Sequence, residues 1–523
     1  MSQSSKKQKV AKFRLAIIDD GVNKNNLGIA LDLENDLEVV DGSVRERSSY
    51  DTYAHSHGTT CIGIISSYFT SFPCTVSSIK ILSKHHRGSV DDMLIALNWC
   101  REHGIKVINM SIGTRDFTAR NRLKTVVNEM AAEGIVIVAA EDNNGYFTYP
   151  AAFTNVIGVK ALQNMLNDGI LLNGNVGIDG IDFLAKAEHD VWLAGEKIKT
   201  SLSNSFATPY VTVQVLQLLD RDVSLDVQNI KNLLRTRMTD QIVCQPNFFD
   251  WSNEYFLCNF SSLLMSEALH SRNIVTYTQI NQDEILLTHF YPSEFTKNST
   301  LVITCDRLGV DKDLDVLSPY FSIYKNVILL DIKRNNIKFL SGLLSSKRNR
   351  EEDGKDSFQI GIDSFNFCAL ECNQSRNNKS VEVPVVALHS CHLDGLVRIM
   401  LEIKDYFFTD GFNCLCLLDS ALGYLCDFLV YNQRTALENV LLNHLSTIYM
   451  ADLILIGSHS YLNEPSVVST DETGVDLFFH LGKGSCSMKF LETKVEFLDL
   501  GNLLEHARSY VEHVSCKIIQ AFG

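Results

Sequence analysis

The stretch SLSNSFATPYV, residues 201–211, decides how the first half of the chain is interpreted. It is a run of Ser and Asn residues that leads into the apolar sequence FATPYVTVQVLQLL. Pro209 has a fixed φ and no N–H, so we expect it in the first turn of a helix, with Ser205 at or just before the helix start. Ser205 is then either an N-cap or a nucleophile, because the unpaired N–H groups at a helix start favour negative charge.

Short apolar strands alternate with amphipathic helices from about Phe13 to Met238. The expected strands are FRLAIID (13–19), SSIKIL (77–82), KVINMSI (106–112) and GIVIVAA (134–140), and the expected helices are 57–68, 90–104, 119–134 and 227–238. Strands that are apolar throughout and are separated by helices predict an α/β fold with a doubly wound, mostly parallel sheet. Ligands of such sheets lie beyond the carboxyl ends of the strands.

Four short segments at these strand ends and helix starts carry the groups that a nucleophilic serine needs. AIIDDGV places Asp19 at the end of a strand, and HSHGTTCIG places His57 directly before a helix. AAEDNNG places Asn143 after a strand, and SNSFATP places Ser205 before its own helix. A serine nucleophile requires a base, a carboxylate that orients the base, and donors for the oxyanion. The sequence therefore predicts one catalytic site at this edge of the sheet.

The chain order Asp, His, Ser is that of subtilisin, and residues 11–238 resemble a subtilisin-like serine peptidase domain of the S8 family. The matching motifs are D-D-G (19–21), H-G-T (57–59), I-N-M-S-I-G (108–113) and S-F-A-T-P-Y-V (205–211). The resemblance implies that Ser205 attacks the scissile carbonyl, that His57 accepts its proton, and that Asp19 orients the imidazole. It also implies that Asn143 and the Ser205 N–H hold the oxyanion, and that the reaction needs no cofactor and no catalytic metal.

Two residues before the expected nucleophile depart from the family pattern. Ser203 and Asn204 replace Gly-Thr, and a serine lacks the freedom in φ that a glycine has. Because every chemical group is retained, we expect a working enzyme. The departure leaves open a catalytically impaired pseudoprotease that serves as a peptide-binding scaffold.

The resemblance also implies substrate-binding residues, namely Ser111, Ile112, Gly113, Glu141, Asp142, Arg87 and Gly88. The segment from Ser111 and the segment Glu141–Asp142 form the two walls of the pocket for the residue before the cut. Two carboxylates there favour Lys or Arg at that residue, unless both side chains point to solvent. Arg87 and Gly88 lie where the family presents an edge strand that pairs with the substrate backbone.

The second half is interpreted as residues 239–298, a linker or packing segment, and residues 299–523, a second α/β domain. VPVVALHSCHLDGLVRIM and the residues after it have the strand, loop, helix, strand outline of a P-loop domain. Leu396 and Val397 occupy the positions of the phosphate-binding Lys and the Ser/Thr that binds Mg²⁺. This half resembles a degenerate, non-catalytic P-loop domain and, faintly, accessory proteins of clostridial peptide-maturation systems.

The composition limits the partners and the compartment. The net charge of −15 over 523 residues argues against nucleic acid or an anionic membrane as a partner. The N-terminus lacks the apolar region of a secretory signal, and no apolar run is long enough to span a membrane. The fourteen cysteines lack framework spacing, and the cluster Cys368, Cys372, Cys391 and His392 lacks a second pair at zinc-site spacing. We therefore expect a cytoplasmic protein with reduced thiols and no metal.

These observations predict a cytosolic serine endopeptidase joined to a non-catalytic domain. The predicted substrate is a ribosomally synthesised peptide precursor whose leader is removed, and other peptide-maturation proteins are possible partners. General intracellular proteolysis by the same residues is the alternative.

Overall fold

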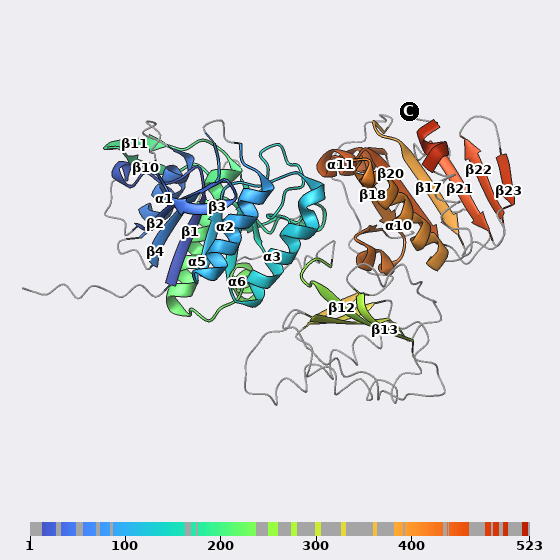
Figure 1. The fold of residues 1–523 in the computed structure, drawn as a ribbon, viewed down its shortest axis with the longest axis horizontal. Helices are drawn as coiled ribbons and strands as arrows, with labels where there is room; N and C mark the ends of the chain where they lie inside the picture. Colours follow the sequence, from blue (N-terminus) through green and yellow to red (C-terminus); the bar gives the residue numbers. More distant parts are fainter. Residues whose placement is uncertain are drawn as a thin grey trace, which may run out of the picture. The chain divides into compact units, whose positions relative to one another are not determined.

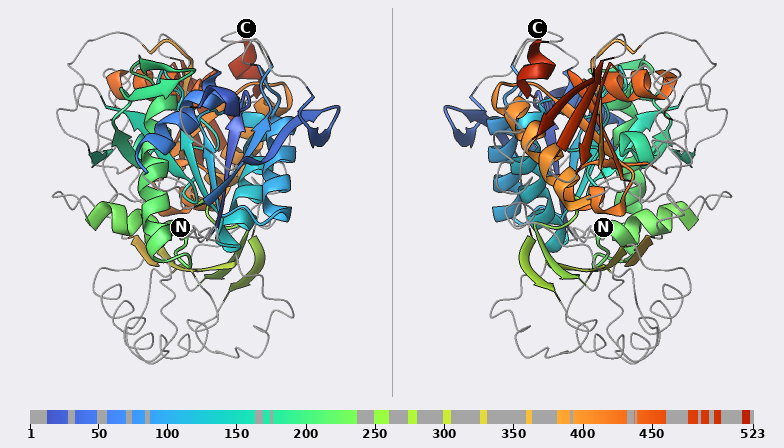
Figure 2. Two further views of the ribbon diagram at one scale, coloured as in Figure 1. Left: turned by 90° about the vertical axis from the view of Figure 1, so that its left-hand side faces the viewer. Right: turned by 90° about the vertical axis from the view of Figure 1, so that its right-hand side faces the viewer.

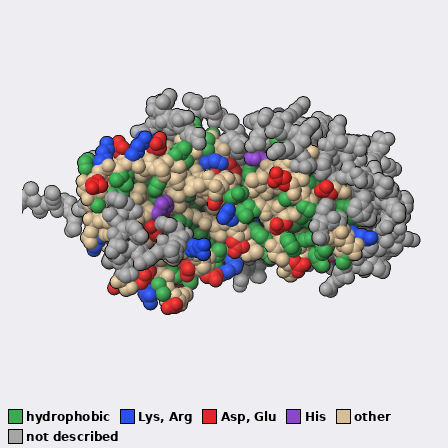
Figure 3. Space-filling view, turned by 90° about the horizontal axis from the view of Figure 1, so that it is seen from above, with side chains coloured by type: hydrophobic (Ala, Val, Ile, Leu, Met, Phe, Trp, Pro, Cys, Tyr) green, Lys and Arg blue, Asp and Glu red, His purple; other side chains and the backbone are tan. Residues whose placement is uncertain are grey.

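The computed structural model divides into two compact units, Met1–Cys244 and Gln245–Gly523, which are described separately (Figure 1). The structure describes residues 13–27, 33–48, 56–69, 74–83, 87–162, 169–173, 176–236, 249–259, 274–279, 299–304, 326–330, 359–362, 381–390, 393–431, 437, 439–459, 476–482, 485–490, 495–499 and 515–520. None of the helices in these ranges has the length and apolar character needed to cross a bilayer. Acidic and basic side chains are interspersed among the described residues on the face seen in Figure 3.

The first unit is built on a nine-stranded sheet of order β3-β2-β4-β1-β5-β6-β7-β9-β8. Its strands are β1 (Phe13–Asp19), β2 (Leu33–Val40), β3 (Ser43–Glu46), β4 (Cys74–Lys80), β5 (Val107–Met110), β6 (Val136–Ala140), β7 (Ile157–Ala161), β8 (Ile170–Leu172) and β9 (Phe183–Ala185). All neighbours from β2 to β9 are parallel, and the outer strands β3 and β8 are antiparallel. The carboxyl ends of β1, β5 and β6 therefore lie at one edge, which is where the predicted site residues follow. A separate hairpin joins β10 (Asp190–Leu193) and β11 (Glu196–Lys199).

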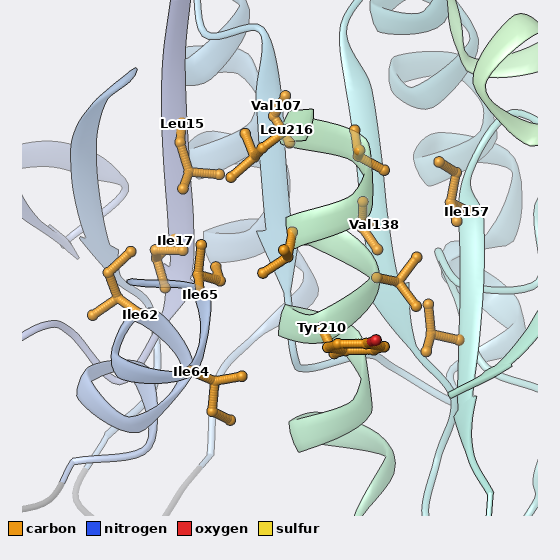
Figure 4. Packing of buried hydrophobic residues seen from close by; sticks show 14 of the residues in the cluster. Leu15, Ile17, Ile62, Ile64, Ile65, Val107, Val138, Ile157, Tyr210 and Leu216 are labelled. Atoms are coloured by element: carbon orange, nitrogen blue, oxygen red, sulfur yellow. The ribbon is translucent and has the colours of Figure 1, made fainter. Parts of the chain in front are cut away.

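Helices cover both faces of this sheet, as the sequence predicts (Figure 2). They are α1 (His57–Ser67), α2 (Val90–Glu102), α3 (Arg120–Ala132), α4 (Val176–Asp179), α5 (Asn204–Arg221) and α6 (Val227–Thr236), with short 3-10 turns η1 (Lys24–Asn26) and η2 (Phe117–Ala119). On one face α1 and α5 pack against each other and against the central strands, and α2 and α3 cover the other face. Figure 4 shows Ile62 and Ile65 of α1 beside Ile17 of β1, and Leu216 of α5 beside Val107 of β5. The central strands are buried throughout because both faces are covered.

The start of α5 differs from the sequence prediction. The helix begins at Asn204, so Ser205 is its second residue and Pro209 lies beyond the first turn. The N-cap is Ser203 rather than Ser205. Pro209 has no N–H to donate to the carbonyl of Ser205 four residues earlier. The Cys61 thiol of α1 donates to that carbonyl instead, at 3.8 Å, which shows how the helix tolerates the proline.

The second unit contains two sheets. One is parallel, of order β13-β12-β14-β15-β16, with strands β12 (Glu254–Asn259), β13 (Ile274–Gln279), β14 (Ser299–Thr304), β15 (Asn326–Leu330) and β16 (Gln359–Ile362). The other, of order β19-β18-β20-β17-β21-β22-β23, has strands β17 (Val385–Ser390), β18 (Cys414–Leu418), β19 (Leu429–Val430), β20 (Leu453–His459), β21 (Leu477–Gly482), β22 (Ser485–Phe490) and β23 (Val495–Asp499). Helix α10 (Leu393–Thr409) packs on β17, β18 and β20, and α11 (Asn439–Tyr449) packs on β20.

The sequence offers seven apolar runs as strands of the second domain, 299–306, 326–332, 358–363, 383–390, 414–420, 451–458 and 494–500, and each corresponds to a strand of the structure. The boundary of the domain differs from the prediction. Strands β12 and β13 lie within 239–298, and β12 pairs with β14, so this segment contributes to a sheet. The apolar residues of β12 and β13 follow no regular spacing, so the sequence does not distinguish these two strands from the residues around them. The P-loop-like outline corresponds to β17, α10 and β18, and Leu396 and Val397 are buried on α10. Its P-loop character and lack of catalysis stay predictions, and Cys368, Cys372, Cys391 and His392 lie outside the described residues.

Candidate active site

The carboxylate of Asp19 and the imidazole of His57 are in direct contact. His57 Nδ1 lies 2.8 Å from Oδ2 and 2.9 Å from Oδ1 of Asp19, which is fully buried at the end of β1. The carboxylate accepts a hydrogen bond from the Nδ1–H group and thereby leaves the lone pair of the ring on Nε2. The side chain of His57 is 23% exposed, so the ring is reachable from the surface.

The surroundings of His57 make its imidazole a stronger base. Burial lowers its pKa, but the Asp19 carboxylate outweighs this effect, and the pKa lies well above the ordinary value of 6.5. Asp19 thus stabilises the positive charge that forms when His57 accepts a proton.

Asp20 fixes the backbone that carries His57. Its Oδ2 accepts the N–H of His57 at 2.9 Å, and its Oδ1 accepts the N–H of Gly58 at 2.7 Å, so it satisfies two free donors at the start of α1. Burial, with a contribution from Asp19, raises the pKa of Asp20. This role of Asp20 was not predicted from the sequence, because the helix start that it caps lies 37 residues further along the chain.

Ser205 lies at the start of α5, next to His57. The ring of its neighbour Phe206 is 5.3 Å from the His57 ring, and Ser205 and His57 border the same cavity of about 670 Å³. No hydrogen bond joins the Ser205 hydroxyl to His57 among the described residues. Bonds between nucleophile and base are often long without substrate and shorten in the productive complex.

Asn143 presents its amide NH₂ group away from the helix start. Its Oδ1 accepts the N–H of Asn204 at 2.9 Å and the hydroxyl of Ser203 at 3.2 Å, so the oxygen faces α5. Asn143 and Ser205 both border the 670 Å³ cavity and a second cavity of about 260 Å³. Asn143 therefore borders the same cavities as the expected nucleophile, with its amide oxygen engaged by α5.

Ser203 and Asn204, the two departures from the family pattern, fit their positions. Ser203 has φ −150° and ψ 142°, which is extended backbone that any residue adopts. The Asn204 side chain donates to the carbonyls of Glu141 and Asp142 at 3.2 and 3.0 Å, and it accepts the N–H of Ala161 at 2.8 Å. Asn204 therefore anchors the start of α5 to the ends of β6 and β7.

We expect Asn204→Ala to lower the free energy of unfolding by about 1–3 kcal/mol, because it leaves buried backbone groups without partners. The first turn of α5 then shifts, and reaction at Ser205 slows. Denaturant titration together with the labelling rate of Ser205 measures both effects. Asn144→Ala is the matched control, because Asn144 is exposed and its side chain donates to the Asp142 carboxylate rather than to a backbone carbonyl. Equal unfolding midpoints for the two variants would show that Asn204 is not an anchor.

Every predicted site residue borders at least one of the two cavities, except Asp19, which lies behind His57. Ser111, Ile112, Gly113, Asn143 and Ser205 border both, and the larger cavity adds Arg87 and Gly88 while the smaller adds Glu141 and Asp142. A Cβ on Gly113 would lie 2.4 Å from a methyl carbon of Thr148, so this wall requires glycine. His55, His85 and His86, which are close in the sequence to segments of the site and have no part in the expected chemistry, lie outside the described residues.

The two acidic residues of the smaller cavity differ in accessibility. The Glu141 side chain is 1% exposed, and Lys160 Nζ lies 2.9 Å from its carboxylate. Asp142 is 24% exposed, and Arg115 lies 3.9 Å from its carboxylate. A direct contact of Glu141 with a basic substrate residue is therefore blocked, whereas Asp142 remains reachable. Lys160 and Arg115 were not predicted as site residues, since neither belongs to a motif.

Burial raises the pKa of Glu141 from 4.5 to about 7, although the nearby Lys160 lowers it. Because the pKa of Glu141 in the folded protein lies above the ordinary value, folding favours the protonated carboxyl. The contribution of this protonated group to the free energy of unfolding is fully present below about pH 4.5 and is lost as the pH rises through about 7. Relative to Glu141→Gln, the unfolding free energy of the wild-type protein should fall by on the order of 3 kcal/mol over this range. Denaturant titrations at several pH values test this, with the exposed Glu196→Gln as control. A pH-independent difference for Glu141→Gln would contradict it.

Comparison with known proteins shows what the first half of the chain is similar to. Residues 11–251 match the sequence model of the subtilase family, peptidase S8. Subtilisin DY of Bacillus licheniformis is 27% identical over 247 residues, which cover 44% of this chain and 85% of that protein. Subtilisin BL of Lederbergia lenta is 24% identical over 235 residues, which cover 43% of this chain and 83% of that protein. A solved cold-adapted subtilisin-like serine proteinase is 21% identical, with 45% of this chain and 84% of that chain covered and a TM-score of 0.35.

Proposed function

We propose that the subtilisin-like serine endopeptidase domain of residues 11–251 cleaves peptide bonds with Ser205 as nucleophile, His57 as base and Asp19 as the carboxylate that orients it. Asn143 and the Ser205 N–H stabilise the oxyanion. The observation that carries the proposal is the contact of 2.8 Å between His57 Nδ1 and the buried Asp19, beside a cavity that Ser205 and Asn143 also border. The shared cavity of His57, Asn143 and Ser205, with Asp19 in contact with His57, supports acyl transfer at this site.

A catalytically impaired scaffold is the less favoured function. Its support in the sequence was the replacement of glycine by Ser203, and the extended φ of −150° removes that argument. Asn204 makes buried hydrogen bonds of its own, so the helix that carries Ser205 is anchored.

The proposed substrate is a ribosomally synthesised peptide precursor in the cytoplasm, and the proposed reaction is removal of its leader. The attached second unit and the peptide-maturation resemblance of that half are the grounds for a narrow substrate. General intracellular proteolysis is the alternative. The test digests a mixed peptide library and unfolded casein with the full chain. A narrow cleavage consensus supports the leader peptidase, and casein digestion at comparable rates contradicts it.

We further propose a basic residue before the cut, held by Asp142 at the smaller cavity. The side chain of Asp142 is the acidic group that remains accessible there, and its contact with Arg115 is 3.9 Å, which a substrate cation can replace. Matched peptides with Lys, Leu or Glu at this residue test the preference. We expect the Lys peptide to be cleaved fastest and Asp142→Asn to remove its advantage. Equal rates for Lys and Leu in the wild-type protein would rule the preference out.

A further inference from the structure

We propose that the second unit carries a docking surface for a basic, amphipathic segment of the peptide substrate. Six residues make up this surface, which is called the α10–α11 edge below: Glu382, Phe408, Asp410, Phe412, Met450 and Asp452. That the bound peptide is the substrate rests on the proposed function, whereas the binding of a basic peptide does not.

Helices α10 and α11 end at the same edge of the second sheet. Strands β17, β18, β20 and β21 are parallel to one another, so their amino ends lie together, with the turns that lead from α10 into β18 and from α11 into β20. Hydrogen bonds join the two turns. Asn413 Nδ2 donates to the carbonyl of Tyr449 at 2.6 Å, and the N–H of Asn413 donates to the carboxylate of Asp452 at 2.7 Å. Phe412 and Met450 therefore lie on adjacent turns.

Met450 holds a backbone conformation that favours glycine, with a φ of 49°. Its N–H donates to the carbonyl of Thr447 at 3.2 Å, and the N–H of Ala451 donates to the carbonyl of Ser446 at 2.9 Å. These two bonds form a Schellman motif with Met450 at the left-handed position. Helices α2, α3 and α10 end in the same motif with a glycine at that position, at φ of 65°, 78° and 85°: Gly104, Gly134 and Gly411. The methionine costs free energy that a glycine avoids.

The large side chains of the α10–α11 edge are apolar and exposed. Phe408 is 44% exposed, Phe412 is 49% exposed and Met450 is 46% exposed. Burial therefore does not offset the backbone strain at Met450. Aromatic residues and methionine are enriched in protein–protein interfaces, and the flexible thioether adapts to irregular surfaces. A strained, exposed methionine beside two exposed phenylalanines indicates a surface that a partner covers.

Carboxylates border these apolar side chains. Asp410 and Asp452 are exposed in the same two turns. Glu382, which is exposed before β17, is tied to α11, because its N–H donates to the side chain of Asn443 at 2.9 Å. Residues 381–459 as a whole contain nine Asp and Glu residues and three Lys and Arg residues. The field at this edge is therefore negative.

The basic side chains that the structure describes in this range are already engaged. Arg398 lies 3.0 Å from the carboxylate of Glu402, and Lys404 donates to the carbonyl of Asp427 at 3.1 Å. The third, Arg434, lies outside the described residues. A partner that complements the edge therefore carries Lys or Arg toward its carboxylates and apolar side chains toward its phenylalanines and methionine.

The proposed substrate is a peptide, so a segment of it away from the cut can supply this chemistry. A peptide that is held at the second unit by one segment presents its other segment to the peptidase at a raised effective concentration. Affinity for such a substrate then depends on two surfaces, and a peptide without the basic segment is cleaved less efficiently.

The test measures binding of two fluorescein-labelled amphipathic peptides, one of Leu and Lys and one of Leu and Glu, by fluorescence anisotropy. The protein is the full chain with Ser205→Ala, so that the peptides are not cut. We expect the Lys peptide to bind more tightly than the Glu peptide, and Phe412→Ser to raise the Kd of the Lys peptide about 10-fold. Asp410→Asn combined with Asp452→Asn should raise this Kd at low salt and reduce its dependence on salt. Trp192→Ser, at a side chain 60% exposed in the first unit, is the matched control and should leave the Kd unchanged.

Met450→Gly separates binding from folding. A glycine adopts a positive φ without strain, so this variant should unfold at a higher denaturant concentration than the wild-type protein. The Kd of the Lys peptide should nevertheless rise about 5-fold or more, because the variant lacks the exposed thioether. Unchanged Kd values in Met450→Gly and in Phe412→Ser would overturn the proposal, as would equal affinities for the Lys and Glu peptides. Self-association of the wild-type chain that Phe412→Ser abolishes, without binding of the Lys peptide, would assign the edge to a second copy and also overturn it.

The outcome can be told apart from that of the proposed function, because binding does not require catalysis. With a cleavable peptide that carries the Leu–Lys segment, Phe412→Ser in the otherwise wild-type chain should raise KM and leave kcat unchanged. If the Lys peptide binds at the edge while Ser205 never reacts with a serine-directed probe, the surface for basic peptides stands and the peptidase function fails. If Ser205 reacts and the Lys peptide does not bind, the peptidase stands and the docking surface fails.

Discussion

Ser205→Ala and His57→Ala should each lower kcat by about 10⁶-fold and abolish labelling by a fluorophosphonate probe. The probe reacts only with a serine whose proton a neighbouring base can accept. Ser205 supplies the nucleophile, and the contact of His57 with the buried Asp19 supplies the oriented base. Because the two groups act as one unit, the double variant should be no slower than either single variant.

The matched control for this experiment is Ser224→Ala, which removes an exposed hydroxyl after α5. It should be labelled at the wild-type rate. A folded wild-type protein that takes up no probe would show that the domain is a peptide-binding scaffold. Labelling that persists in Ser205→Ala would assign the nucleophile to another residue.

The second large effect is expected at Asn143, where loss of the amide donor should lower kcat by about 10²–10³-fold with little change in KM. The donor contacts the oxyanion of the transition state and does little for the bound substrate. Asn143→Ala also removes the acceptor for the N–H of Asn204. Asn143→Asp keeps that acceptor and removes only the donor, so steady-state kinetics of both variants separate the two roles.

Both Asn143 variants should be impaired if the donor matters, and the Asp variant at least as strongly, because its carboxylate repels the developing negative charge. Asn144→Ala, one residue further along, is the control for the loop. Wild-type kcat in Asn143→Asp would mean that Asn143 only anchors the start of α5.

The groups that react could be predicted from the sequence, because they follow strand ends of a parallel sheet. Asp19 ends β1, and Asn143 follows β6, so one edge of the sheet brings them together. The groups that hold them could not be predicted in the same way. Asp20 and Asn204 act on backbone N–H and C=O groups, whose position depends on where each helix begins. The helix start itself was misplaced, because Pro209 tolerates a position beyond the first turn when another donor serves the Ser205 carbonyl.

The two carboxylates of the smaller cavity show a second limit of prediction from the sequence. Glu141 and Asp142 are adjacent in the sequence, yet one is buried against Lys160 and the other is reachable. Successive residues at a strand end point to different sides, so the motif alone does not tell which carboxylate meets solvent. In the second half, seven of the strands were visible as apolar runs. The division of these strands between two sheets could not be predicted, because the pairing of each strand depends on contacts throughout the unit.

The extended backbone of Ser203 has a consequence for how relatives of this chain are found. A search pattern that demands glycine two residues before the nucleophile discards this sequence, although its backbone needs no glycine there. A pattern built on backbone geometry accepts any residue that tolerates an extended conformation at that position. Such a pattern selects instead for an anchoring side chain at Asn204. Chains set aside as inactive for lack of that glycine deserve the same serine-directed probe.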